Sequence, residues 1–281
     1  MSSILSGLAG EIWQVLTLIK IAVAVIMVLG LSLIAERASP RMAGIASGFP
    51  LGSAVTLFFI GLEVGPDFAG QSAVYTILGL TATQCFAGGY YLASIWTSAR
   101  TKPWSVTMSA GAGLAMYAAA SWAAWPLQAG WPLATAVTLA AVLLFDSFFK
   151  RIQNVKIVDR KKFGPAQLLA RALFAAAIIV VITAAARIIG PKWSGLLSAF
   201  PTTMLPLMAI IHYSYAPEHV HAIIKNVPRG LVSLMIYCLA VYFGYAPLGV
   251  YWGTLAAYAL AIVYLIVISV NHRPAVRRNW S

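Results

Sequence analysis

The sequence predicts an all-α membrane protein, a polytopic bundle of about nine spanning helices. The composition, the length of the apolar runs and a repeat within the chain all predict it. Of the 281 residues, 61% are apolar and 9% are charged, whereas soluble domains are nearer half apolar and a quarter charged. This small number of charges cannot cover a surface that faces water. We therefore expect the chain to lie in a bilayer, namely an inner (cytoplasmic) membrane of the bacterial type.

Nine apolar runs are long enough to cross the hydrocarbon as helices, which takes about 20 residues. The predicted spans are Ile12–Ala35, Met42–Val64, Gln71–Trp96, Trp104–Trp125, Pro132–Phe149, Ala166–Ile189, Trp193–Tyr215, Val227–Gly244 and Leu248–Val270. The first run is long and lacks a basic leader, so we expect it to remain as a helix instead of being cleaved as a signal peptide.

The basic residues predict the orientation of these spans. The net charge is +12, and the Lys and Arg residues fall between the apolar runs, which favours membrane topology over a nucleic-acid partner. Residues Lys150–Lys162 contain six of them and are expected in the cytoplasm. Alternate connections are also basic: Arg37 and Arg41, Arg100 and Lys102, Lys225 and Arg229, and Arg273, Arg277 and Arg278. We therefore expect the N-terminus outside and the C-terminus in the cytoplasm, with Arg187 and Lys192 as exceptions.

A repeat at an offset of 151 residues indicates an internal duplication. The segment Pro40–Pro50 aligns with Pro191–Pro201, and the same offset pairs Pro66-Asp67 with Pro217-Glu218 and Lys20 with Arg171. The domains predicted are a first unit of five spans (1–149), a basic linker (150–164) and a second unit of four spans (165–281). The motifs lie in the second and seventh predicted spans, a step of five, so the units are expected to have opposite orientations, as in many secondary transporters.

The second unit resembles a known family. Ser194-Gly-Leu-Leu-Ser-Ala-Phe-Pro-Thr202, then Ile211-His-Tyr213 and Val241-Tyr-Phe243, are similar to the small four-span GlpM-like membrane proteins, over about 110 residues. In the first unit Gly61-Leu62 replaces the His-Tyr pair and a fifth span is added. The resemblance implies two fused, inverted units of this kind, and it implies no activity.

Proline interrupts the second and seventh predicted spans near the middle of the membrane. A proline inside a helix removes a backbone hydrogen bond, and it displaces the preceding residue from helical geometry. We expect Pro50 and Pro201 to occupy the first position of a new helical segment, with the N–H groups and positive dipole end favouring an anion. The expected substrate-binding residues are Ser47, Gly48, Phe49, Pro50, Ser53, Ser198, Phe200, Pro201, Thr202 and Thr203. The alternative is a packing kink in which the Ser and Thr hydroxyls only satisfy freed carbonyls.

Charged and titratable residues within the spans form a second group of candidates. Lys20 and Arg171 occupy matching positions, which favours a pair of cations facing an anion, although Arg171 is also placed to reach the cytoplasmic interface. Glu63 and His212 are candidates for gating or coupling, against the simpler readings of a solvated cap and an interfacial histidine. Asp146 precedes Lys150 by four residues, the spacing of a helical ion pair.

These observations predict a secondary transporter that moves a small anionic or amphiphilic metabolite by alternating access. The alternatives are a channel, a flippase for a lipid-linked anion, and a non-transporting accessory subunit of an envelope-polysaccharide or lipid pathway. No nucleotide-binding loop, metal-ligand cluster or catalytic dyad occurs in the sequence, so we expect no enzyme activity, no cofactor and no metal. A homodimer is the expected oligomer, and the substrate and the coupling ion stay open.

Overall fold

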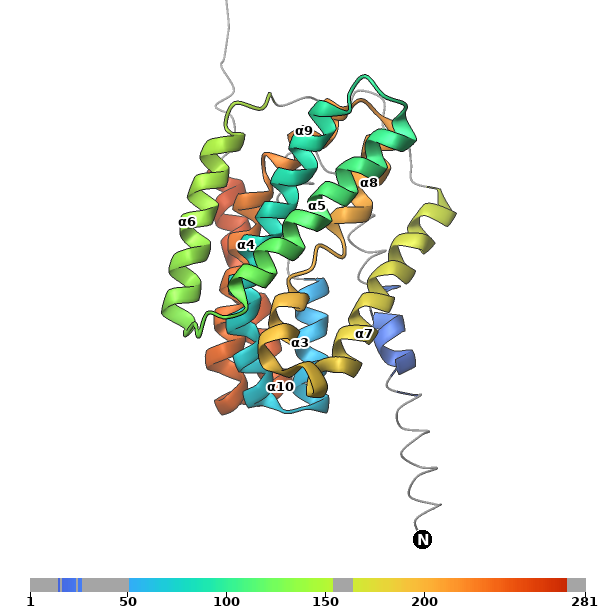
Figure 1. Ribbon diagram of the computed structural model, residues 1–281. Helices are drawn as coiled ribbons and strands as arrows, with labels where there is room; N and C mark the ends of the chain where they lie inside the picture. The colour runs from blue at the N-terminus through green and yellow to red at the C-terminus, as the bar shows by residue number, and fades with distance from the viewer. Residues whose placement is uncertain (1–14, 16, 24, 27–50, 154–163, 272–281) are drawn as a thin grey trace, which may run out of the picture.

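The computed structural model describes residues 15, 17–23, 25–26, 51–153 and 164–271, which form helices and no strand. Residues between 15 and 26 are helical where they are described. The labelled helices are α3 (Gly52–Glu63), α4 (Pro66–Trp96), α5 (Lys102–Ala124), α6 (Trp131–Phe149), α7 (Pro165–Ser198), α8 (Met204–Ser214), α9 (Pro217–Ile224) and α10 (Val227–Asn271). Figure 1 shows them as a single bundle.

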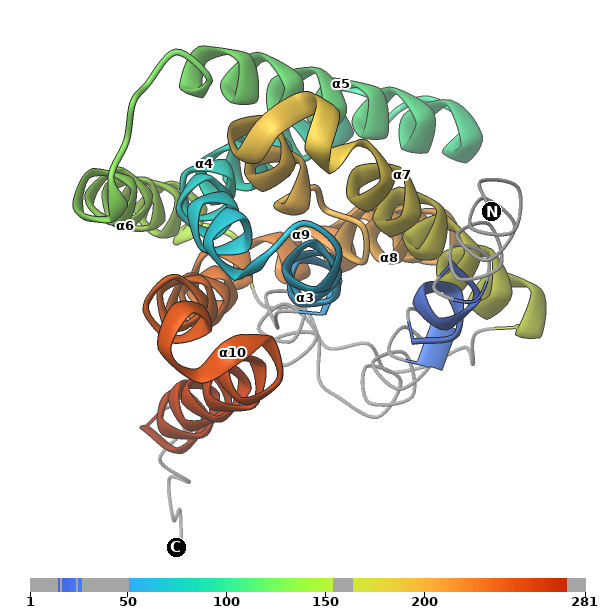
Figure 2. The same cartoon turned by 90° about the horizontal axis from the view of Figure 1, so that it is seen from below.

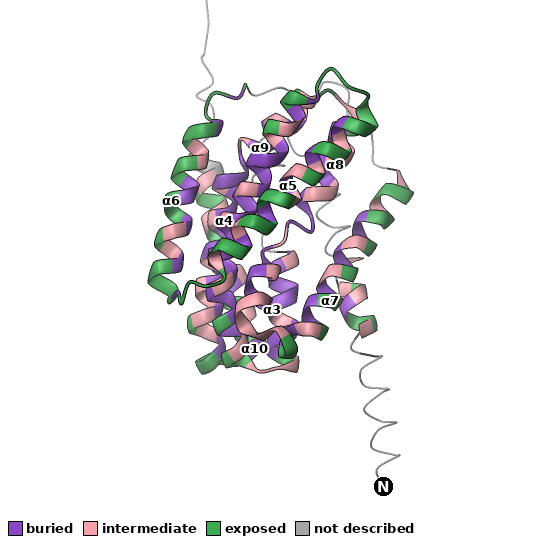
Figure 3. Cartoon of the chain, viewed as in Figure 1, coloured by how far each residue is buried: buried purple, intermediate pink, exposed green. Residues whose placement is uncertain are grey.

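Helix α4 forms the centre of the bundle. It packs against α3, α5, α6, α7, α9 and α10, and most of its residues are buried (Figure 3). Viewed from below (Figure 2), α3 lies among α4, α7 and α10, while α5 and α6 lie towards the outside. Pro66 occupies the first turn of α4, where its missing N–H leaves no hydrogen bond broken.

Among the described residues, three helices are long and apolar enough to cross a membrane: Trp131–Phe149, Pro165–Ser198 and Val227–Ile268. Large apolar side chains also face outward, including Leu143 at 69%, Leu144 at 67% and Ile188 at 88% exposure. Large apolar side chains exposed in such number are typical of a surface that contacts a membrane or a partner. The architecture is therefore an all-helical one associated with a membrane.

Two of the long helices contain a sharp internal turn at glycine. Gly190 in α7 has φ 75° and ψ 172°, and Gly249 in α10 has φ 73° and ψ 170°. A side chain is strained in this left-handed region, whereas glycine is not. Each long helix therefore consists of two segments, and the turns fall at the ends of predicted spans. The second segment of α7, Pro191–Ser198, turns back into the bundle (Figure 1).

Candidate functional site

The helical structure is interrupted between α7 and α8, at the second of the two predicted interruptions. The last carbonyls of a helix have no partner within the helix, and in an apolar surrounding they need donors from elsewhere. Three hydroxyls from three other helices supply them. Ser53 Oγ donates to Ser198 O (2.6 Å), Thr83 Oγ1 to Ala199 O (2.7 Å) and Tyr117 OH to Leu196 O (2.6 Å). Side chains of α3, α4 and α5 thus satisfy the carbonyl groups that the interruption leaves without helical partners.

The helix resumes later than the sequence predicted. We expected Pro201 at the first helical position, but α8 begins at Met204, with Thr203 as its N-cap residue. Pro201 O does accept a bond from Leu205 N (2.9 Å). The next residue, Pro206, has no N–H to donate to Thr202 O. The regular helical hydrogen bonds therefore start only at Thr203 O, which accepts from Leu207 N.

The first predicted interruption is described only in part. Ser47, Gly48, Phe49 and Pro50 lie outside the described residues, and α3 begins two residues after Pro50, at Gly52. A Cβ atom built on Gly52 would stand 2.3 Å from Thr202 Oγ1. The start of α3 is therefore packed directly against the break that precedes α8. This contact joins the two predicted motifs.

A cavity lies where these two segments meet. It is lined by Gly52, Ser53, Thr83, Ala199, Phe200, Pro201, Thr202, Thr203, Met204, Leu231 and Leu234. Its volume is about 30 Å³, which is room for one or two water molecules. Five of the predicted substrate-binding residues belong to this wall, and Ser198 is bonded to it through Ser53. The structure therefore brings together the described members of both motifs.

The hydroxyls at the cavity fall into two groups. Ser53 and Thr83 donate to the broken carbonyls, and Ser198 Oγ donates to Ser194 O one turn earlier (2.6 Å). For these three residues, the hydroxyl groups satisfy backbone carbonyls, as in the alternative of a packing kink. The Thr202 and Thr203 hydroxyls make no hydrogen bond to any other residue in the described part of the chain, so they are the side-chain donors at the cavity.

Lys20 is buried in an ion pair that the sequence analysis did not predict. Its side chain is 1% exposed, and Nζ lies 2.6 Å from Glu63 Oε1 and 2.7 Å from Thr183 Oγ1. The ammonium group also stands 5.6 Å from the centre of the Phe59 ring. Glu63 is 14% exposed, so the expectation of a solvated cap was wrong for this residue. Removing one partner of such a buried pair costs about 3–5 kcal/mol.

We had expected Lys20 and Arg171 to face one anion, but they lie far apart. Both are buried, at 1% and 2% exposure. Lys20 contacts α7 at Thr183, twelve residues beyond Arg171, which is about 18 Å along a helix.

His212 is buried and connects three helices. Its Nδ1 lies 3.1 Å from Tyr90 OH of α4, and its Nε2 lies 3.3 Å from Ser105 Oγ of α5. Ser105 Oγ is in turn 2.8 Å from Thr97 Oγ1. His212 is 2% exposed, so it is deeper than the interfacial position that we expected. Its hydrogen bonds are satisfied, as the simpler reading required.

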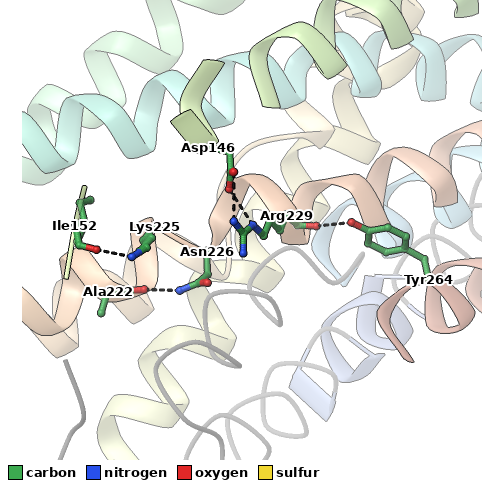
Figure 4. Close-up of polar contacts among 7 residues, drawn as sticks. All are labelled: Asp146, Ile152, Ala222, Lys225, Asn226, Arg229 and Tyr264. Carbon is green, nitrogen blue, oxygen red and sulfur yellow. Dashed lines mark hydrogen bonds and ion pairs between the residues drawn. The ribbon is translucent and has the colours of Figure 1, made fainter. Parts of the chain in front are cut away.

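Asp146 pairs with α10 and not with Lys150 (Figure 4). Arg229 Nε and Nη2 donate to the two carboxylate oxygens of Asp146 at 2.9 and 3.3 Å. Tyr264 OH donates to Arg229 O (3.1 Å), and Lys225 Nζ donates to Ile152 O. The planar guanidinium can bind both carboxylate oxygens at once, a geometry that Lys150 cannot offer. The end of α6 is thereby fixed to α10.

Sequence reasoning missed Thr83, Tyr117 and Thr183. Each is a hydroxyl residue within a predicted span, and each binds a group more than 75 positions away in the chain. The sequence shows a polar residue within an apolar span at each of these positions, but it does not specify the group to which that residue binds. Asp67 and Glu218, which the offset of 151 residues pairs, are both exposed. No family model matches this chain, and no curated protein or solved structure matches it.

Proposed function

We propose that this protein is a secondary transporter for a small anionic or amphiphilic metabolite, working by alternating access. The proposed architecture has nine spans in two inverted units, and the proposed substrate position is the cavity between the start of α3 and the start of α8. The inner membrane and the outward N-terminus belong to the same proposal.

The observation that carries the proposal is the position of that cavity. Two helices of different halves, α3 and α8, have their first residues in its wall. Helix N-termini carry unpaired N–H groups and the positive end of the helix dipole, and both favour an anion. The Thr202 and Thr203 hydroxyls add neutral donors. Leu231, Leu234 and Phe200 supply apolar surface, which suits an amphiphilic molecule better than a bare inorganic ion.

The size of the cavity favours a carrier over a fixed pore. A volume of about 30 Å³ is far below the several hundred Å³ of ordinary ligand sites. A metabolite therefore enters only if α3 and α8 separate, and this is the movement that alternating access requires.

The helix boundaries support an inverted repeat. At the offset of 151 residues, the last residue of α3, Glu63, corresponds to Ser214, the last residue of α8. Pro66, the first residue of α4, corresponds to Pro217, the first of α9. Two independent helix ends thus agree with the same offset that aligns the sequence motifs.

Transport by purified full-length protein in proteoliposomes tests the proposal. We expect saturable uptake and counterflow for one or more members of a panel of organic anions and lipid phosphates. The double variant Thr202→Val, Thr203→Val should lose at least about tenfold in flux, because each lost donor to a charged group is worth about 1.5 kcal/mol or more. Thr135→Val, on the exposed face of α6, is the matched control. Flux without saturation would indicate a channel. Absence of flux from wild type, with variants that fold as wild type does, would indicate an accessory subunit.

A further inference from the structure

Helix α8 connects the cavity to a chain of hydrogen-bonded side chains at its other end. Thr203, its N-cap residue, lines the cavity, and His212 lies in its last turn. These two residues are nine positions apart, about 14 Å along a helix. The helix packs against α5 and α9 (Figure 1). A displacement of the His212 end of this rigid element therefore also moves the residues at the cavity.

The direction of each hydrogen bond in this chain follows from its last member. Thr97 Oγ1 donates its single proton to Ala93 O (2.7 Å), so it can only accept at its 2.8 Å contact with Ser105 Oγ. Ser105 thus donates to Thr97 and accepts from His212 Nε2, which lies 3.3 Å away. The other ring nitrogen, Nδ1, accepts from Tyr90 OH at 3.1 Å. These partners assign His212 as a neutral imidazole with its proton on Nε2.

The neutral histidine satisfies all of these groups, whereas a protonated histidine would not. Both ring nitrogens of a charged imidazole are donors, so a proton on Nδ1 would meet the hydroxyl that now donates to it. Tyr90 would then have to turn its own proton away, and no second acceptor for it occurs among its contacts in the described part of the chain. Tyr90 is 0% exposed, and a buried donor without a partner is destabilising. Protonation therefore weakens the link between α8 and α4.

The charges around His212 favour the same displacement. The ionisable groups towards this end on α8 and on the helices that contact it are Tyr90 and Tyr91 of α4, Lys102 of α5, Arg171 of α7, Tyr213 of α8, and Glu218, His219 and His221 of α9. Lys102 is close enough for its charge to act on His212, so a positive charge on the histidine would be repelled. No carboxylate of the described residues forms an ion pair with His212.

We propose that His212 is a pH-sensitive switch, which in its neutral form holds α8 against α4 and keeps the cavity closed. This inference rests on the proposed transport function and concerns the regulation of the same cavity. One proton from the solution binds to Nδ1, the hydrogen bond from Tyr90 is lost, and the bond from Nε2 to Ser105 remains. The end of α8 then leaves α4, and its first residues move away from α3. Acid conditions thus favour the open cavity.

Distances between spin labels on the purified full-length protein in detergent test the switch. In a chain whose Cys85 and Cys238 are replaced by alanine, the labels are attached at Trp96→Cys and Tyr213→Cys, at exposed residues near the ends of α4 and α8. A fall from about pH 8 to about pH 5 spans the titration of an ordinary histidine. It should shift the mean distance by more than about 2 Å, and absence of a shift would overturn the inference.

A second pair of labels is the matched control. Trp96→Cys with Leu144→Cys places them on α4 and α6, and Leu144 is also exposed. This distance does not involve α8, so it should stay constant over the same pH range. An equal shift in both pairs would show that the whole bundle loosens in acid, which contradicts a switch at His212.

Two substitutions separate the charge of His212 from its hydrogen bonds. His212→Gln keeps a donor and an acceptor but cannot take up a proton, so it should hold the closed distance at both pH values. Tyr90→Phe removes the bond to Nδ1 and should give the acid distance already at about pH 8. His219→Gln, on α9, should behave as the parent chain does. A shift that persists in folded His212→Gln would overturn the inference.

The tautomer of His212 is a separate check that does not depend on movement. Ring-nitrogen magnetic resonance of histidine-labelled protein, with the signal assigned by its loss from His212→Gln, distinguishes the two nitrogens. At about pH 8 the proton should lie on Nε2. A proton on Nδ1 would reverse the order of donors along the chain and would contradict the switch.

Transport measurements distinguish this inference from the function on which it rests. Saturable counterflow without any change of distance between about pH 8 and about pH 5 would leave the carrier and remove the switch. A change that depends on His212, in a chain without flux, would retain the switch and remove the carrier. Where both hold, flux through the wild-type chain should rise as the pH falls, and His212→Gln should abolish that rise.

Discussion

At the scale of single residues, the most consistent feature is the use of hydroxyl groups to satisfy carbonyls at the break after α7. Ser53, Thr83 and Tyr117 each donate to a carbonyl of the segment 196–199. Such bonds are needed because the broken helix ends inside the bundle, where water is not available to each carbonyl. The prolines in the sequence predicted the break, whereas the donors come from helices that the sequence does not relate to it.

The substitution Tyr117→Phe should therefore lower stability by removing one of these donors and nothing else. Tyr117 is 4% exposed, and its hydroxyl is bound at 2.6 Å to Leu196 O. We expect a loss of about 1 kcal/mol in the free energy of unfolding, the usual range for a hydrogen bond between membrane helices. Thermal unfolding in detergent measures it. Tyr213→Phe, at a residue that is 57% exposed, is the control, and equal effects of the two substitutions would contradict the prediction.

His221, on the short helix α9 outside the predicted spans, should make stability depend on pH. Burial lowers the pKa of His221 from 6.5 to about 4, with Glu218 acting in the opposite direction and His212 adding to the lowering. Its Nε2 lies 2.7 Å from Ser94 Oγ. Because the folded chain holds this histidine neutral, its contribution is complete above about pH 6.5. It is lost progressively as the pH falls towards about 4, where the unfolded chain binds the proton more readily.

Thermal unfolding of wild type and His221→Gln across this pH range provides the measurement. The variant should lose less stability than wild type between pH 6.5 and 4. His219→Gln, on the same helix, is the control and should keep the wild-type slope. If wild type and both variants show the same slope, burial of His221 is not the cause of the acid sensitivity.

At the scale of elements, the short segment Pro191–Ser198 is held by close contact with α4. A Cβ atom built on Gly195 would stand 2.2 Å from Ser72 O and 2.6 Å from Tyr75 Cβ. Small residues at such contacts allow two helix backbones to approach closely, which is how helices associate in a membrane. The repeat predicted this segment through its alignment with the first motif. Its packing partner is a consequence of the fold alone.

Gly195→Ala should therefore destabilise the bundle, because the added methyl group meets a backbone oxygen that cannot move independently of α4. We expect a loss of about 1–3 kcal/mol, as in other overpacked cores, together with a lower yield of folded protein. Gly111→Ala is the matched control: this helical glycine of α5 has nothing within 4 Å of the added Cβ and should change stability by less than about 1 kcal/mol. Equal stability of the two variants would exclude the close contact.

At the scale of the whole molecule, two successive connections that we predict on opposite sides of the membrane lie towards opposite ends of the bundle. The connection between α4 and α5, which carries Arg100, lies at the upper end in Figure 1, and the connection between α5 and α6 lies at the lower end. The exception Arg187 has a local explanation, since it donates to the carbonyl of Glu63 at the C-terminus of α3. Cations are favoured at that end of a helix.

Labelling with a membrane-impermeant maleimide in oriented vesicles tests this orientation. In a chain whose Cys85 and Cys238 are replaced by alanine, the variant Ser98→Cys should be labelled only from the cytoplasmic side. Gln128→Cys should be labelled only from the opposite side, because basic connections stay in the cytoplasm. Both positions are exposed. Labelling of both from the same side would require a different number of spans between them.

The sequence by itself determined the helical class, the association with a membrane and the break near Pro201. These properties depend on composition, on runs of about 20 apolar residues and on the backbone geometry of proline, which act over short stretches of chain. Only the tertiary structure decided that Lys20 pairs with Glu63 and that Asp146 pairs with Arg229. Helical periodicity specifies partners three or four residues away, whereas these charges meet across different helices that only the fold brings together.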